Sequence, residues 1–125
     1  MTKRTIYTSE APDPIGAYSQ GVVTGNTLFI SGQIGLDPTS MEMRDSFTLQ
    51  AKQVFSNLSA IMHEAGTNLE EIVKLTVFLT DLENFPVLNE IMIETFKKPF
   101  PARSVVEISR LPKDALVEIE AIVKV

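Results

Sequence analysis

The spacing of hydrophobic residues along the chain predicts two amphipathic helices. In segment 47–65 apolar side chains recur at helical spacing, with Asp45 or Ser46 as candidate N-cap and Gly66 as a stop. A second helix is predicted at about 85–96, between an early proline and two lysines. The apolar stripes are Phe47, Ala51, Val54, Phe55, Leu58, Ile61, Met62 and Ala65 in the first helix, and Phe85, Leu88, Met92 and Phe96 in the second.

Short stretches of β-branched or alternating apolar residues predict six strands. Gly25-Asn26 indicates a hairpin between the second and third, and Asn68 with Glu71 resembles a capping box for one short helical turn. The resulting order, β-β-β-α-β-α-β-β, predicts an α+β fold with two helices on one face of a mixed sheet. Apolar residues on the other face indicate a partner, most simply a second copy. The predicted strands are 5–7, 20–23, 27–30, 73–80, 103–108 and 116–123.

Length and composition favour one globular domain spanning residues 1–125. The chain has 125 residues, 44% hydrophobic and 22% charged, which is near the average for globular proteins. Eleven basic and sixteen acidic side chains give a net charge of −5, which argues against nucleic-acid binding. No apolar run approaches the roughly 18 residues of a membrane span, so we expect a cytoplasmic protein without a membrane partner.

Two residue counts restrict the chemistry that is open to the chain. There is no cysteine, which excludes thiol nucleophiles and thiolate metal sites. The one histidine, His63, excludes a multi-histidine metal site and lies opposite the apolar stripe of its predicted helix. We therefore interpret His63 as a solvated surface residue, and we expect no metal site.

A few polar side chains have both a functional and a purely structural interpretation. Glu118 and Glu120 share one face of the last strand, where a carboxylate could act as a general acid or base or be a solvated strand residue. Arg103 begins a strand and is either a surface cation or a bidentate carboxylate ligand. Tyr18 is either a packing residue or a ligand contact. Residue type and spacing alone leave these alternatives open.

Several motifs, taken in order, resemble one protein family. The chain carries Pro14-Ile15-Gly16-Ala17-Tyr18-Ser19-Gln20, Phe29-Ile30-Ser31-Gly32-Gln33-Ile34 and Phe100-Pro101-Ala102-Arg103-Ser104. It continues with Lys74-Leu75-Thr76-Val77-Phe78-Leu79-Thr80-Asp81 and with Leu111-Pro112-Lys113-Asp114 through Val117-Glu118-Ile119-Glu120-Ala121. Each motif alone has low specificity. Their order and spacing over nearly the whole chain, however, resemble the reactive intermediate/imine deaminase family, also called the RidA or YjgF/UK114 family.

The resemblance implies a fold, an assembly and an activity. The implied fold is the chorismate-mutase-like α+β domain, assembled as a homotrimer with a central barrel and with sites between subunits. The implied activity is cofactor-independent hydrolysis of 2-imino acids, such as 2-iminobutanoate and 2-iminopropanoate and their enamine tautomers. The products are 2-keto acids and ammonia. Small 2-imino and 2-keto acids are therefore the expected ligands.

The resemblance also implies roles for individual residues. Arg103 corresponds to the arginine that binds the substrate carboxylate, and Glu118 corresponds to the glutamate that holds the attacking water. Tyr18 corresponds to a tyrosine that lines the cleft. Three further correspondences concern substrate binding. Ser31 and Gly32 correspond to a serine-glycine turn beside the ligand, and Asn89 corresponds to an asparagine near the site. Val105 corresponds to a residue whose backbone groups serve the site.

Two positions depart from the family pattern. Many deaminase members have cysteine at position 105, where this chain has Val105, and Ala17 replaces the more usual proline. Loss of the proline frees φ in the loop that carries Tyr18. These departures leave open an alternative function as a non-catalytic, regulatory binder of small carboxylates. A translation inhibitor or endoribonuclease is a third alternative, which the net charge of −5 disfavours.

Overall fold

A computed structural model describes residues 2–125, which form six strands and two α-helices in the predicted order. The helices are α1 (Phe47–Glu64) and α2 (Phe85–Thr95), and three short 3₁₀ turns are η1 (Leu69–Glu71), η2 (Leu82–Asn84) and η3 (Pro112–Asp114). The strands are β1 (Arg4–Ile6), β2 (Gly21–Thr24), β3 (Thr27–Ile34), β4 (Ile72–Leu79), β5 (Ala102–Glu107) and β6 (Val117–Lys124).

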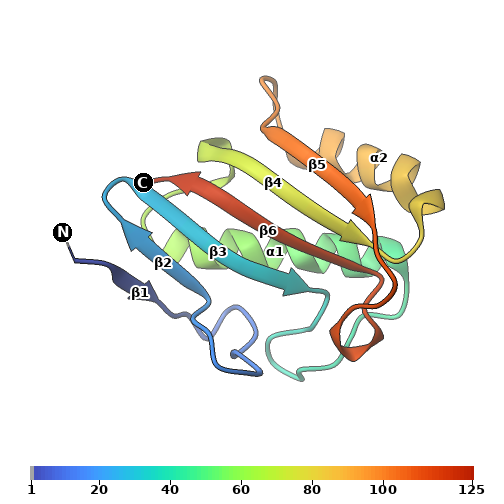
Figure 1. Ribbon diagram of the computed structural model, residues 1–125, viewed down its shortest axis with the longest axis horizontal. Coiled ribbons are helices and arrows are strands. Elements are labelled where there is room, and N and C mark those ends of the chain that lie inside the picture. The colour runs from blue at the N-terminus through green and yellow to red at the C-terminus, as the bar shows by residue number, and fades with distance from the viewer. Residues whose placement is uncertain (1) are drawn as a thin grey trace.

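All six strands belong to one sheet, in the order β1-β2-β3-β6-β4-β5. β4 and β5 pair in parallel, whereas every other neighbouring pair is antiparallel, so the sheet is mixed. Figure 1 shows both helices behind this sheet, with α1 crossing its centre and α2 behind the β4–β5 edge. The predicted α+β arrangement, with the helices on one face of a mixed sheet, is confirmed.

The main core lies between the sheet and the two helices. Leu58 and Ile61 of α1 are fully buried, as are Leu75 of β4 and Ile119 of β6. Ser46 is the N-cap of α1, and its Oγ accepts the N–H of Leu49 at 3.2 Å. The apolar stripe predicted from helical spacing is therefore the buried face of the helix.

The largest departure from the predicted elements is in β3, which continues to Ile34 instead of ending at Ile30. A β-bulge explains the difference: Ile30 pairs with Ala121 and Gln33 pairs with Ile119, so two residues of β3 oppose one residue of β6. The bulge interrupts the alternation of apolar and polar residues by which a strand is recognised. The sequence pattern consequently ends the strand too early.

Three buried carboxamide side chains hold the loops at one end of the sheet. Gln20 is 1% exposed, Gln50 4% and Asn57 0%. Each makes hydrogen bonds to backbone groups in the loops or at the end of β3, which satisfies polar groups that would otherwise be costly to bury. Their bonds join Gln20 to Thr8 and Pro12, Gln50 to Arg44 and Leu116, and Asn57 to Ile34 and Leu36.

A close approach between β3 and α1 leads to a prediction about stability. A Cβ atom on Gly35 would lie 2.7 Å from the Cα of Gln50, so the helix backbone would have to move. We expect Gly35→Ala to lower the free energy of unfolding by about 1–3 kcal/mol, the usual cost of overpacking. Equilibrium urea unfolding at one fixed protein concentration measures this, and an unchanged midpoint would contradict it.

The sheet face opposite the helices is partly apolar, as the strand pattern predicts. Phe29 of β3 is 47% exposed and pairs with Ile122 of β6, which is 36% exposed. Val106 of β5 is 44% exposed and pairs with Phe78 of β4. Across residues 2–125, none of the helices has the length and hydropathy that crossing a membrane requires.

Candidate functional site

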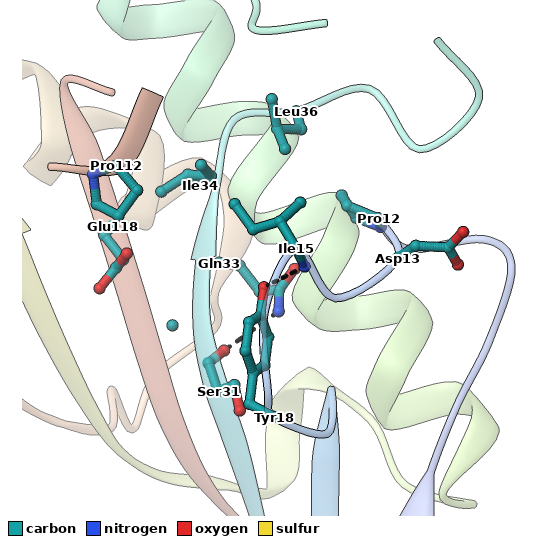
Figure 2. A pocket seen from close by; sticks show the side chains of 11 residues that line it. Pro12, Asp13, Ile15, Tyr18, Ser31, Gln33, Ile34, Leu36, Pro112 and Glu118 are labelled. Atoms are coloured by element: carbon teal, nitrogen blue, oxygen red, sulfur yellow. Dashed lines mark hydrogen bonds between the residues drawn. The ribbon is translucent and has the colours of Figure 1, made fainter. Parts of the chain in front are cut away.

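A cleft of about 230 Å³ lies at the end of the sheet where β3 and β6 meet the loops. The loop before β2 forms one wall, the end of β3 forms the floor, and Glu118 with Pro112 forms the opposite wall (Figure 2). Four residues predicted for substrate contact or catalysis line this cleft: Tyr18, Ser31, Gly32 and Glu118. Residues far apart in the sequence are thus brought together in one cleft.

The Glu118 carboxylate fits against the β3 bulge only because residue 32 is glycine. A Cβ atom on Gly32 would lie 2.7 Å from Oε2 of Glu118 and 2.8 Å from its Cδ, which is closer than van der Waals contact. Burial raises the pKa of the Glu118 carboxyl above its ordinary value, and the Glu120 carboxylate on the same face of β6 raises it further. Glu118 is therefore a carboxylate with increased proton affinity at the edge of a cleft.

Tyr18 and Ser31 are fixed by hydrogen bonds to the backbone of the loop that precedes β2. The Tyr18 hydroxyl accepts the backbone N–H of Ile15 at 3.1 Å, which leaves its own hydrogen free to donate. Ser31 Oγ donates to the backbone carbonyl of Ser19 at 2.6 Å, so its remaining capacity is as an acceptor. Figure 2 shows the Tyr18 ring standing between Ser31 and Ile15. The side-chain groups available to a ligand here include the Tyr18 hydroxyl hydrogen, an acceptor site on Ser31 Oγ and the Glu118 carboxylate.

Sequence reasoning missed the apolar part of this cleft and the residue that supports its loop. Ile34 and Leu36 line it together with Pro112, and Ile15 stands above Tyr18 (Figure 2). Buried Gln20 holds the loop through the Thr8 backbone, accepting its N–H at 2.7 Å and donating to its carbonyl at 3.0 Å. Gln20 falls inside a predicted strand. A carboxamide side chain among apolar strand residues is the only sequence signal that could have indicated this supporting role.

Arg103 and Asn89 lie in a second hollow, of about 480 Å³, formed by α2 and the start of β5. Arg103 Nη1 donates to Asn89 Oδ1 at 2.7 Å, and the guanidinium carbon is 5.1 Å from the centre of the Phe85 ring. Neither of the two salt bridges found within residues 2–125 involves Arg103. The side chain is thus held by neutral groups and keeps its charge available for an anion.

The two hollows lie on opposite faces of the sheet. Arg103 pairs with Leu75, a buried residue of the helix-covered face, whereas Glu118 pairs with Phe78 on the other face. One chain therefore does not bring Arg103 and Glu118 together. Val105, predicted as a substrate contact, packs against the main core and lines neither hollow.

The structure offers little for binding a metal ion. His63 is exposed at the end of α1, as the helical pattern predicts. Within residues 2–125 no three histidine, cysteine, aspartate or glutamate side chains are close enough to hold a metal ion together. The polar groups of the two hollows can instead bind a carboxylate and move a proton.

Comparison with known proteins places the chain in a family. Residues 8–125 match the family model described as endoribonuclease L-PSP. A RutC family protein of Pyrococcus abyssi is 48% identical, covering 98% of this chain and 97% of that protein. A protein of Dermatophagoides farinae named 2-iminobutanoate/2-iminopropanoate deaminase is 45% identical, covering 97% of this chain and 95% of its own length.

Solved structures agree with the sequence comparison. The crystal structure of RidA from an Antarctic Psychrobacter bacterium matches with a TM-score of 0.97 and 49% identity, covering 98% of this chain and 99% of that one. The coverage shows that the likeness extends over nearly the whole chain and is not limited to the sheet. The chain therefore belongs to the endoribonuclease L-PSP family, which is the RidA/YjgF family that its motifs resemble.

Proposed function

We propose that the protein hydrolyses reactive 2-imino acids to 2-keto acids and ammonia, with 2-iminobutanoate and 2-iminopropanoate as its substrates. One observation carries the proposal: the chain has an arginine free for a carboxylate, and a partly buried glutamate whose pKa is raised above its ordinary value. These two groups match the two parts of an imino acid, a carboxylate and an electrophilic C=N carbon. The deaminase name of the mite relative supports the same activity.

The proposed site is shared between copies of the chain in a homotrimer. Arg103 and Glu118 lie on opposite faces of the sheet, so a complete site needs Arg103 from one copy and Glu118 from another. The partly apolar face with Phe29, Val106 and Ile122 supports packing of sheets around a central barrel, as in chorismate-mutase-like assemblies.

In the proposed mechanism Arg103 binds the substrate carboxylate through two charge-assisted hydrogen bonds, which gives the imine carbon one orientation. Glu118 accepts a proton from a water molecule as that water attacks the carbon and the C=N bond becomes a C–N single bond. Glu118 then returns the proton to nitrogen, which gives a carbinolamine. It next transfers the hydroxyl proton of the carbinolamine to nitrogen, so that the C–N bond breaks, ammonia leaves and the C=O bond of the keto acid forms. Tyr18 and Ser31 orient the water molecule and the nitrogen atom of the substrate.

An assay of ammonia and keto-acid release tests the function directly. A threonine dehydratase generates 2-iminobutanoate in place, and we expect the protein to accelerate formation of 2-oxobutanoate over the spontaneous rate. RNA cleavage is measured alongside. Binding of 2-oxobutanoate without acceleration would instead favour a regulatory binding protein, and RNA cleavage without deamination would favour an endoribonuclease.

The effect of Glu120 on Glu118 leads to a prediction about pH. Because Glu120 raises the pKa of Glu118, Glu120→Gln is expected to lower that pKa. Glu118 must be ionised to act as a base, so the acid limb of the kcat/KM profile should move to lower pH. Lys124→Gln is the control, since six residues of strand put it roughly 20 Å away. An acid limb that stays in place in Glu120→Gln would contradict the prediction.

A further inference from the structure

The guanidinium group of Arg103 is held by three side chains from one helix. Its Nη1 donates to Asn89 Oδ1 at 2.7 Å and also to the thioether sulfur of Met92 at 3.3 Å. The Phe85 ring covers one face of the group, with 5.1 Å between the guanidinium carbon and the ring centre. These residues are one helical turn apart on α2, so the helix presents them to Arg103 as a single surface.

Counting hydrogens shows which edge of the guanidinium is left for a ligand. Arginine has five N–H groups, two of them on Nη1, and Asn89 and Met92 accept both. Three N–H groups remain, one on Nε and two on Nη2. The Nε–H and one of the Nη2–H groups point in parallel along one edge. A planar carboxylate can accept both in the bidentate arrangement. The other edge, between Nη1 and Nη2, has no free hydrogen on Nη1.

We propose that Phe85, Asn89 and Met92 are positioning residues that present the Nε–Nη2 edge of Arg103 to the carboxylate of the ligand. Asn89 then acts through Arg103 and does not itself contact the substrate, in contrast to the binding role that the family resemblance implies. Met92 acquires a role for which its sequence position, in the apolar stripe of a helix, gives no sign. The choice of a 2-keto or 2-imino acid as the ligand rests on the proposed function.

Nitrogen-15 NMR of the arginine Nε–H groups tests the choice of edge. The Arg103 resonance is identified by its absence from the spectrum of Arg103→Lys. Titration with 2-oxobutanoate is expected to shift this resonance in proportion to the bound fraction, because the carboxylate accepts the Nε hydrogen. A resonance that does not move when the protein is saturated would overturn the proposal.

Binding measurements on helix variants test the positioning role. Asn89→Leu removes the acceptor of a charged hydrogen bond, and we expect 2-oxobutanoate to bind about tenfold or more weakly. Met92→Leu keeps the volume but removes the weak sulfur acceptor, for which we expect a loss of about two- to fivefold. For Phe85→Leu we expect a loss of 2-oxobutanoate affinity in the same range as for Met92→Leu. Glu90→Gln, exposed on the same helix, is the matched control and should bind as the unaltered protein does.

Double-mutant cycles separate positioning from direct contact. In an Arg103→Ala background each of the three substitutions should have no further effect on 2-oxobutanoate binding, because the group that they position is gone. Additive losses would place Asn89 or Met92 in direct contact with the ligand and overturn the proposal. In imine turnover the single variants should raise KM more than they lower kcat, since they weaken the hold on the carboxylate but leave the Arg103 guanidinium in place.

These tests remain decisive if the proposed function fails. Binding and NMR with 2-oxobutanoate need no turnover, so an inactive protein that shows the Nε–H shift and the coupling supports the positioning role and refutes only the deaminase function. An active deaminase without the shift or the coupling refutes only the positioning role.

Discussion

Arg103→Lys is expected to abolish imine hydrolysis while the fold and the assembly persist. A lysine ammonium has no planar edge with two parallel N–H groups, so it cannot fix the carboxylate in one orientation. Glu118→Gln should also abolish turnover but should retain 2-oxobutanoate binding, because Arg103 is intact. Turnover is measured with imine generated by a threonine dehydratase, and assembly is measured by light scattering. Full turnover by Arg103→Lys would refute the assignment of Arg103.

Combining the two inactive variants should then restore activity that neither has alone. In mixed assemblies, a site that takes Arg103 from one copy and Glu118 from another is intact when each copy supplies its undamaged half. Random mixing of equal amounts makes about a quarter of all sites intact in a closed ring, which corresponds to about a third of the sites in the mixed trimers. Co-expression with two different affinity tags isolates the mixed assemblies for assay.

A second mixture controls for unspecific rescue. Glu118→Gln combined with Gly32→Ala damages the same half-site in both chains, so the activity should not exceed the residual activity of Gly32→Ala. If verified mixed assemblies of Arg103→Lys and Glu118→Gln stay inactive, the site is not shared between copies in the proposed way.

Gly32→Ala is expected to remove most of the activity at little cost in stability. The added methyl group would lie 2.7 Å from Oε2 of Glu118, so the carboxylate must swing away from its position against β3. The end of a flexible side chain can yield at low cost, in contrast to the helix backbone that opposes a methyl group on Gly35. Deaminase assays and urea unfolding on both alanine variants test this contrast. Equal loss of stability in both variants, or full activity in Gly32→Ala, would contradict it.

The elements of the fold could be predicted wherever a single periodicity persists over several turns or residues. The apolar stripe of α1 and the alternation in β4 and β6 predict those elements because each has one buried face. The bulge in β3 could not be predicted, because it depends on pairing with β6 and leaves no periodic signal within its own strand. Strand boundaries elsewhere differ from the prediction by about one residue, the usual uncertainty at element ends.

The polar residues of the candidate site could be predicted from the sequence, but their arrangement in space could not. Gly32 and Glu118 come together because β3 pairs with β6, and the loop before β2 brings Tyr18 to the same cleft, which residue types alone do not reveal. The separation of Arg103 from Glu118 depends on strand register, which assigns each side chain to a sheet face. Leu36 and Pro112 were missed because an apolar residue in a loop has no distinguishing pattern.

The placement of Arg103 and Glu118 on opposite faces has a consequence for the amount of protein that a cell must make. If the site is shared as proposed, each chain carries two incomplete half-sites and gains a working site only by assembling with another chain, so mass action governs the yield of sites. Below the dissociation constant of the assembly, halving the protein concentration removes more than half of the working sites. Weak expression of the gene would then give less activity per molecule of protein than strong expression. Activity would rise steeply only once the protein concentration exceeds the dissociation constant of the assembly.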